Sequence, residues 1–406
     1  MEITQLNNLQ SSGEPLVDFG HQPVSNRFLP LGDEGVVPAY PLQLRVCIET
    51  GLIHMAKPFP VEEMKPRYDW LTCYEPEDHL DALTERIIKL PNVTKASTFG
   101  AYSFKDDSTL RRLERLGYGK NWRIDPVQDL DVPDPCANVE TYQCALTPSK
   151  AEEIRERKGA ADVFIVRHVV EHAYDLPAFI KAIRKMVRPG GYIVWELPDC
   201  ERPIAAGDCT VVWEEHVFYF TSFTFKELLL KSGFSILYHE SVPYPLENSL
   251  VSIVQEALEG NNPVNVDAKL AAEEVARARK FAEALARRKV EVRSKLERIR
   301  LQRGSIAIFG AGHLTVAFLS IMQVTDLISC VVDDNPNKKG MQMPVGGLEI
   351  VGSEALYSRD IHVCLLGLNP QNQPKVVANH KKFIEQGGVF ASIFPGSALD
   401  LESMEC

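Results

Sequence analysis

Residues 161–199, ADVFIVRHVVEHAYDLPAFIKAIRKMVRPGGYIVWELPD, decide the expected fold. The stretch predicts a buried strand over Val163–Arg167, a loop that carries Glu171 and His172, a helix over Asp175–Val187, a Pro-Gly-Gly turn and a second buried strand. Strand, crossover helix and strand form the unit of a parallel sheet covered by helices. The stretch therefore predicts the second half of a doubly wound α/β domain.

A second informative stretch follows at 211–234, VVWEEHVFYFTSFTFKELLLKSGF. Glu214, Glu215 and His216 stand between an aromatic cluster and a predicted helix. A histidine beside a carboxylate in apolar surroundings can exchange a proton near neutral pH, as general acid/base catalysis requires. His216 is therefore a candidate base, and the alternative is a structural histidine that Glu215 satisfies.

The totals limit the possible functions. The chain has 406 residues, enough for two or three domains, and its 45% hydrophobic and 24% charged residues are ordinary for a globular protein. A net charge of −11 argues against nucleic-acid binding. No apolar run is long enough to cross a bilayer and no secretion signal is recognisable, so we expect a cytoplasmic protein without a membrane partner. The nine cysteines lack C-x-x-C spacing and are expected to be reduced.

The order of these segments resembles that of class I methyltransferases and, more narrowly, of the sugar-nucleotide C-methyltransferases of deoxysugar biosynthesis. In that family an E-H-x-x-Y-F segment carries the histidine proposed to remove a proton next to a ketone. The matching residues here are Glu215, His216, Tyr219 and Phe220. The resemblance implies C-methylation of a keto-sugar nucleotide or related polar keto metabolite, with His216 as base, Glu215 as its orienting partner and Tyr219 as a wall or hydrogen-bond donor.

The resemblance also implies S-adenosylmethionine as cofactor. In methyltransferases the first loop reads E/D-x-G-x-x-x-G, and an acidic residue after the second strand binds the ribose hydroxyls of the cofactor. This chain keeps only Gly100 of the loop. Asp125 stands at the position of the ribose-binding acid. Lys105, together with amides that open a helix, could bind an anion instead. The cofactor-binding candidates are Gly100, Lys105, Asp107, Asp125, Arg167 and His168. The altered loop leaves two alternatives open: a donor-free epimerase, isomerase or lyase, and a non-catalytic binding partner.

The amino-terminal part resembles the small zinc-binding module of the same family, but only Cys47 of its cysteines is present. A structural zinc site needs four ligands, and His21 and His54 could supply two at most. We therefore expect no metal and no zinc. Further along, Tyr68, Tyr74, Glu75 and His79 match a family segment that closes over cofactor and substrate, with an acidic helix cap as the alternative.

The carboxy-terminal part predicts a second, smaller Rossmann-like domain, since apolar strands lead into glycine turns or polar helices. Its F-G-A-G-H turn and VVDDNPNKKG run resemble the family segments that help to hold a nucleotide sugar. A dinucleotide site and a purely structural turn are the alternatives. The substrate-binding candidates are Tyr74, Glu75, Ser249, Gly310, Gly312, His313, Asp334 and Asn369.

The expected organisation has four parts. They are an amino-terminal module at 1–60, a methyltransferase-like domain at 61–262, a linking helix at 263–303 and the Rossmann-like domain at 304–406. The helix is expected because no Gly or Pro interrupts 264–303. It could serve as a connector or pack in a homo-oligomer.

Overall fold

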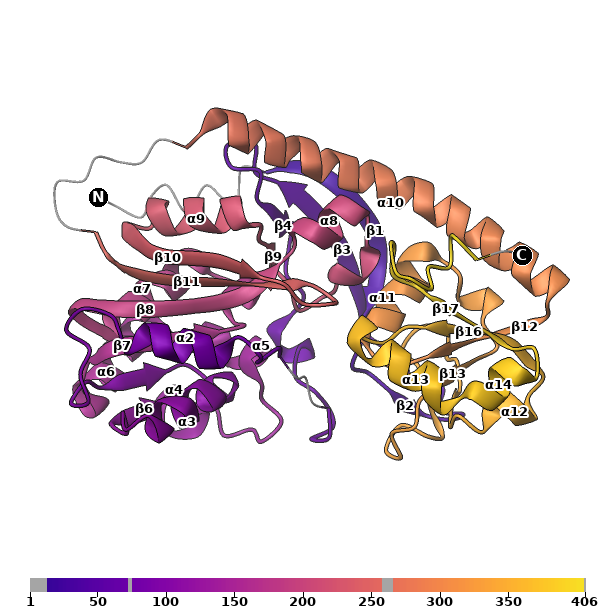
Figure 1. The fold of residues 1–406 in the computed structure, drawn as a ribbon, viewed down its shortest axis with the longest axis horizontal. Coiled ribbons are helices and arrows are strands. Elements are labelled where there is room, and N and C mark those ends of the chain that lie inside the picture. Colours follow the sequence, from indigo (N-terminus) through magenta and orange to yellow (C-terminus); the bar gives the residue numbers. More distant parts are fainter. Residues whose placement is uncertain (1–12, 72–74, 258–265, 405–406) are drawn as a thin grey trace.

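The computed structural model describes residues 13–71, 75–257 and 266–404 and contains a four-stranded, a six-stranded and a five-stranded sheet, with a two-stranded ribbon (Figure 1). The six-stranded sheet has the order β10-β11-β8-β7-β5-β6. Its strands are β5 (Phe99–Ala101), β6 (Asn121–Arg123), β7 (Ala161–Arg167), β8 (Val187–Asp199), β10 (Phe234–Val242) and β11 (Asn248–Glu256). The four strands β6, β5, β7 and β8 are parallel, and β11 and β10 complete the sheet as an antiparallel hairpin.

Both faces of this sheet are covered by helices, as its apolar strands require. Along β7, Phe164 and Val166 face one core, and Val163 and Ile165 face the other. The first face packs on α5 (Val139–Tyr142), α6 (Pro148–Lys158), α7 (Leu176–Lys185) and α9 (Ser222–Lys231). The second packs on α2 (Leu80–Ile87) and α3 (Asp107–Arg115). The predicted class I methyltransferase-like α/β fold is confirmed.

The Pro-Gly-Gly segment corrects one detail of the prediction. It lies inside β8 rather than in a turn before it, and the pairing with β7 jumps from Ala161–Val187 to Val163–Tyr192. Gly190 has φ +73°, a left-handed conformation that glycine adopts without strain, so the strand bulges without leaving the sheet.

The amino-terminal module forms the four-stranded sheet β1-β3-β4-β9. Its strands are β1 (Glu14–Pro23), β3 (Ala39–Val46), β4 (Ile53–Met55) and β9 (Phe218–Tyr219). The last of these comes from the distant segment that follows His216, with Ile53 paired to Tyr219 and His54 to Phe218. The module therefore fixes the backbone immediately after the candidate base.

The long helix α10 (Ala268–Gln302) runs along the amino-terminal module and the carboxy-terminal domain (Figure 1). Its buried residues recur every three or four positions, and Phe281, Leu285 and Leu296 join one core with Leu44 of the module and Phe318 of the carboxy-terminal domain. The apolar stripe of α10 is thus covered by this chain itself. Its use in a homo-oligomer stays a prediction.

The carboxy-terminal domain is a parallel sheet of order β15-β13-β12-β16-β17. Its strands are β12 (Ser305–Phe309), β13 (Cys330–Val332), β15 (Ile350–Val351), β16 (Ile361–Leu366) and β17 (Val389–Ser392). Its helices are α11 (His313–Met322), α12 (Ala355–Ser358), α13 (Gln373–Asn379) and α14 (Lys381–Glu385). The ribbon pairs β14 (Met341–Gln342) with β2 (Leu29–Pro30) and so ties this domain to the amino-terminal module.

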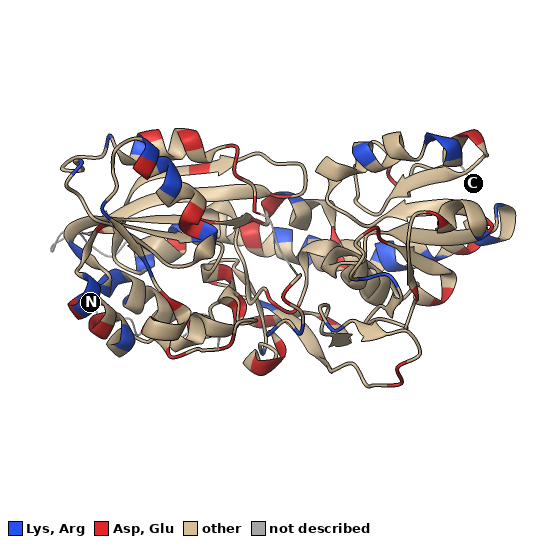
Figure 2. Cartoon of the chain, turned by 90° about the horizontal axis from the view of Figure 1, so that it is seen from below, with Lys and Arg blue, Asp and Glu red and all other residues tan. Residues whose placement is uncertain are grey.

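Short elements complete the fold. They are α4 (Pro126–Leu130), α8 (Glu201–Ala206), η2 (Val61–Glu63), η3 (Phe104–Asp106), η4 (Gln143–Ala145), η5 (Val170–His172), η6 (Cys209–Val211), η7 (Thr325–Leu327) and η8 (Pro370–Asn372). In the view of Figure 2 acidic and basic residues are interspersed along the helices. Among the described residues no helix is long and apolar enough to span a membrane.

Candidate functional site

One cavity of about 1100 Å³ lies where the three folded parts meet. Its wall includes Ser25 of the amino-terminal module, Lys105 and His168 after β5 and β7, and Gly312 of the carboxy-terminal domain. Open α/β sheets bind ligands beyond the carboxyl ends of their strands, which is where Lys105 and His168 lie. The cavity is therefore the candidate active site.

His216 lies on this wall, in the loop between η6 and β9. The loop is anchored on both sides of the histidine. Before it, the Glu214 carboxylate accepts hydrogen bonds from the Ser25 amide (2.6 Å) and hydroxyl (2.8 Å). After it, the Val217 amide donates to the Glu171 carbonyl at 2.9 Å, and β9 pairs with the amino-terminal module. The imidazole is thus placed by three separate segments.

The His216 ring is packed among other rings, with centroids 5.1 Å from His172, 5.2 Å from Trp213 and 6.2 Å from Tyr219. Burial, reinforced by nearby His172 and His313, lowers the pKa of His216 well below its ordinary value. The ring is therefore neutral with its lone pair available, and burial at the same time makes it a weaker base than an exposed histidine. Its Nδ1 has no hydrogen-bond partner among the described residues.

Glu215 contacts a different histidine from the one expected. Its backbone carbonyl accepts a hydrogen bond from His172 Nδ1 at 2.7 Å, and no hydrogen bond joins the Glu215 carboxyl to His216 in the described chain. Burial, with Glu140 and Glu214 nearby, raises the pKa of Glu215 well above its ordinary value. Tyr219 is buried away from the cavity, and its hydroxyl donates to the Trp213 carbonyl at 3.4 Å. The catalytic roles of Glu215 and Tyr219 stay predictions.

Lys105 forms a buried charged cluster at the carboxyl end of β5. Its Nζ lies 2.8 Å from Glu75 Oε1 and 3.6 Å from Glu140 Oε1, and all three residues line the cavity. Although burial opposes it, His168 and Lys105 hold the pKa of Glu75 below its ordinary value. The wall at this point carries a cation flanked by carboxylates.

Behind that cluster, Arg167 and Glu196 form a fully buried ion pair, with Arg167 Nε 2.6 Å from Glu196 Oε2. The other Glu196 oxygen lies 3.2 Å from His168 Nε2, and His79 Nε2 lies 3.2 Å from Oε2. His168 has φ +50°, a left-handed conformation that is uncommon for a residue with a side chain. The network ties the ends of β7 and β8 to the start of α2.

The other predicted cofactor residues lie off the cavity wall. A Cβ on Gly100 would come within 2.5 Å of the Phe164 ring, so this glycine allows close packing of neighbouring strands. Asp107 forms an ion pair with Arg123. Asp125 caps α4, its Oδ1 accepting from the Val127 and Gln128 amides. The cofactor assignments stay predictions.

The carboxy-terminal wall carries some of the predicted substrate residues. His313 stacks on Trp213 across the domain boundary, with centroids 4.0 Å apart and planes 21° apart. Gly312, which precedes α11, has open space around its Cα. Glu75, Ser249, Gly312, His313 and Asn369 line the cavity, whereas Gly310 and Asp334 do not. Tyr74 lies outside the described residues.

A dinucleotide site requires a free acid after the second strand to bind the ribose. Asp333 stands at this position, but its Oδ2 accepts from the Ala311 amide at 2.9 Å and contacts Lys338 Nζ at 3.1 Å. The acid is therefore occupied by contacts within the protein. This geometry disfavours the dinucleotide alternative.

Sequence reasoning gave no role to several residues of the site. Glu140 belongs to no motif that we recognised, and Trp213, Glu196 and Lys338 lie in stretches that we singled out without giving these residues a role; only the folded chain brings them to the cavity or behind it. Glu171 and His172 were noticed in a loop but were given no function. Their signal was the E-H dipeptide in the loop that follows a buried strand, which repeats the E-H of 215–216.

The amino-terminal module holds one cysteine, Cys47, which is free and buried. His54 is buried with Nδ1 near the Met55 carbonyl, whereas His21 is exposed. In the described part of the module these residues do not form a group of three metal ligands. The expected absence of zinc stays a prediction.

Three family models match the chain. Residues 10–64 match a "Putative zinc binding domain", residues 106–239 a methyltransferase domain and residues 254–395 a C-methyltransferase C-terminal domain. The first match runs against the expectation of no zinc. No curated protein matches the chain.

Solved methyltransferase structures give weaker matches. The 1,6-didemethyltoxoflavin-N1-methyltransferase of Burkholderia thailandensis is 12% identical, with TM-score 0.30 over 45% of this chain and 78% of its own. An S-adenosylmethionine-dependent methyltransferase of Clostridium acetobutylicum is 9% identical, with TM-score 0.29 over 46% and 93%. Likeness this low says nothing of the reaction. The domain matches follow one another along the chain: a methyltransferase domain is followed by a C-methyltransferase C-terminal domain, and the chain is a methyltransferase.

Proposed function

We propose that the chain transfers a methyl group from S-adenosylmethionine to a carbon beside a carbonyl, in a keto-sugar nucleotide or a related polar keto metabolite. The observation that carries the proposal is the single cavity shared by the Lys105 cluster, His216 and the Gly312 turn. Such a reaction needs a place for the methyl donor, a base and a place for the anionic part of the substrate, and the residues that we assign to these three tasks line one space.

The part of the cavity wall formed by Lys105, Glu75 and Glu140, here called the Lys105 wall, fits the amino-acid end of S-adenosylmethionine. That end is a zwitterion, and Lys105 flanked by Glu75 and Glu140 offers a cation for its carboxylate and carboxylates for its ammonium group. Asp125 lies off the cavity wall, so its contact with the ribose stays a prediction from the resemblance. When bound, the donor supplies an electrophilic methyl group at this wall.

His216 supplies the proton transfer. Its neutral ring takes the proton from the carbon beside the carbonyl, which leaves an enolate whose carbon can attack an electrophile. The neutral state is favoured because the ring is buried beside His172. The anchors at Ser25 and Glu171 hold the loop, so the base keeps a fixed position relative to the Lys105 wall.

Two features support a nucleotide sugar as substrate. The amino terminus of α11 has no side-chain cap, and Gly312 leaves room for a diphosphate to approach its free amides. Lys338, on the same wall, adds a cation, although it also bonds to the Ala311 carbonyl at 2.6 Å. The Trp213–His313 stack offers an aromatic surface between the two regions.

Calorimetry with S-adenosylmethionine tests the donor site. We expect binding to the wild-type protein and weaker binding to Lys105→Met, because this variant removes the cation but keeps the length of the side chain. Arg123→Met, a change at an ion pair off the cavity wall, is the matched control. No binding to the wild-type protein, or equal binding to both variants, would contradict the donor assignment.

A donor-free epimerase, isomerase or lyase is the second candidate. It is favoured by the Lys105–Glu75 pair, which occupies the wall where methyltransferases have an open glycine turn. This enzyme would convert a keto sugar without S-adenosylmethionine. Product that forms only when the donor is present excludes it.

A further inference from the structure

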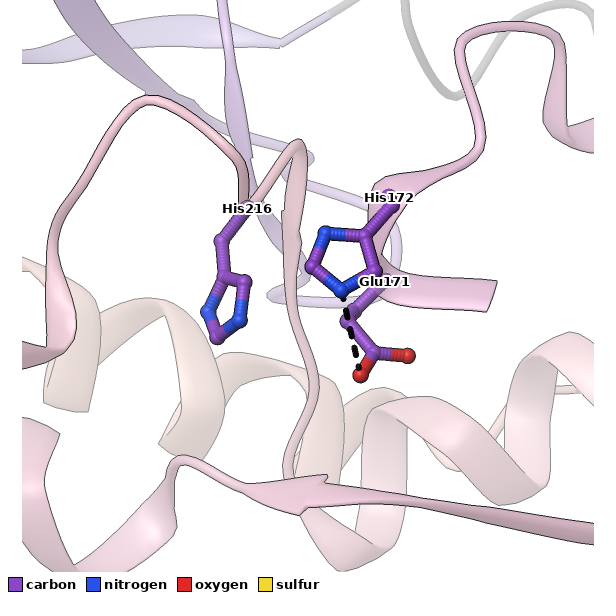
Figure 3. A group of neighbouring side chains, drawn as sticks. All are labelled: Glu171, His172 and His216. Carbon is purple, nitrogen blue, oxygen red and sulfur yellow. Dashed lines mark ion pairs between the residues drawn. The ribbon is translucent and has the colours of Figure 1, made fainter. Parts of the chain in front are cut away.

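A group of potential metal ligands lies on the cavity wall, separate from the amino-terminal module. Glu171, His172 and His216 each offer one ligand atom, and these atoms lie within 4.8 Å of one another. The side chains come from two segments, η5 and the loop before β9, and lie side by side in Figure 3. Among the described residues no other group of three such ligands was found.

The hydrogen bond of His172 decides which of its nitrogens is available. Nδ1 faces the Glu215 carbonyl at 2.7 Å, and because a carbonyl only accepts, Nδ1 carries the proton when the ring is neutral. The lone pair of Nε2 then points toward Glu171 Oε1 at 3.7 Å and Glu140 Oε1 at 3.5 Å. In metal-bound histidines one ring nitrogen usually donates a hydrogen bond to a carbonyl or carboxylate, and this contact orients the other nitrogen toward the metal.

Polar atoms around this lone pair have no hydrogen-bond partners among the described residues. Glu171 is 2% exposed, and neither of its carboxylate oxygens has a hydrogen-bond partner in the described chain. His216 is 6% exposed, and its Nδ1 is also without a partner. These buried polar atoms therefore lack the partners that buried polar groups usually have, and a cation between them would supply one.

The spacing suits a small ion. Two ligands at about 2.1 Å from a tetrahedral zinc lie about 3.4 Å apart. The 3.7 Å between His172 Nε2 and Glu171 Oε1 is close to this value, and it is too long for a direct hydrogen bond. Lys105, the nearby cation, is already balanced by Glu75 and Glu140.

We propose that Glu171, His172 and His216 form a site for a divalent transition-metal ion, with Zn²⁺ as the reference ion and its remaining position open to the cavity. Two imidazoles and one carboxylate are a donor set that zinc and its neighbours in the first transition row prefer. The ion would use the same His216 lone pair that the proposed base needs, so the metal-bound state and the proton-accepting state of His216 exclude each other. It is also distinct from the amino-terminal module, whose lone Cys47 led us to expect no zinc.

The test is metal binding by the full chain after dialysis against a chelator. Zn²⁺ should bind at one equivalent in calorimetry, and Co²⁺ should give the visible absorption bands of a low-coordinate site with nitrogen ligands. His172→Gln and Glu171→Gln should each weaken Zn²⁺ by more than the roughly 10- to 100-fold that the loss of a supporting residue costs. His239→Gln, which changes a half-buried histidine away from the cavity, is the control and should bind as the wild type does.

Each result decides the proposal. Wild-type protein that binds neither ion overturns it, and so does zinc that is lost on Cys47→Ser but kept on His172→Gln, because the ion would then belong to the amino-terminal module. If a buried variant fails to fold, as judged by circular dichroism, the Co²⁺ spectrum of the wild type still decides. Bands of a cobalt site with sulfur ligands, or no bands, would contradict the Glu-His-His site.

Discussion

Replacing Arg167 by Met tests the buried charge network that supports the cavity. The substitution leaves Glu196 fully buried without its main partner, and it also removes donors to Lys105 O and to Pro76 O. Removal of one partner of a buried ion pair costs ~3–5 kcal/mol. The upper part of that range applies because both side chains are 0% exposed.

The assay is guanidinium unfolding followed by tryptophan fluorescence, since Trp195 is buried next to Glu196 in β8. Arg123→Met is the matched control: its pair with Asp107 is about one-third exposed on both sides, and loss of such a pair costs at most about 1 kcal/mol. The double variant Arg167→Met with Glu196→Met should recover part of the loss, because it no longer buries an unpaired charge. If Arg167→Met and Arg123→Met lost equal stability, the network would not be the support that we describe.

Two further predictions concern other parts of the chain. Gly312→Asp should weaken binding of a nucleoside diphosphate at least about tenfold, which corresponds to ~1.4 kcal/mol, because the side chain fits into open space and its charge repels phosphate. Gly312→Asn is the neutral control. Equal affinity of the two variants would contradict a phosphate site at this turn. Burial lowers the pKa of His239 from 6.5 to about 4, so the folded protein binds fewer protons than the unfolded chain between these values, and stability should fall as pH drops from 6.5 toward 4. In His239→Gln the melting temperature should therefore change less with pH between 6.5 and 4 than in the wild type. If it changed as much as in the wild type, the lowered pKa of His239 would be refuted.

Local patterns predicted the parts of the fold that depend on neighbouring residues. The strand at 163–167 and the helix at 175–187 appear as β7 and α7 because apolar runs and helical spacing are properties of one segment. The long helix predicted at 264–303 appears as α10 (Ala268–Gln302) for the same reason, and residues 264–265 lie outside the described residues. Pairings between distant segments could not be predicted in this way, and the clearest case is β9 with β4 of the amino-terminal module.

In the candidate site, too, residues in a recognisable local motif could be predicted, whereas residues brought together from distant segments could not. His216 was noticeable because its E-H-V-F-Y-F context matches a known segment, and it does line the cavity. Glu140 is in a four-residue helix with no motif, yet the fold brings it within 3.6 Å of Lys105 and 3.5 Å of His172. Glu215 shows that neighbours in sequence need not contact each other: the turn at Trp213–His216 directs the Glu215 carbonyl to His172, and the orienting role of its carboxylate toward His216 stays a prediction.

The central claim is that His216 removes the proton beside a carbonyl, and solvent exchange tests it most directly. In deuterated water the wild-type protein should wash deuterium into the carbon beside the carbonyl of a nucleoside-diphosphate keto sugar, with or without S-adenosylmethionine. His216→Ala should slow this exchange by roughly a hundred- to ten-thousand-fold while its circular dichroism spectrum stays native, and Glu215→Gln should slow it less. Full exchange by a folded His216→Ala protein would show that His216 is only a packed histidine.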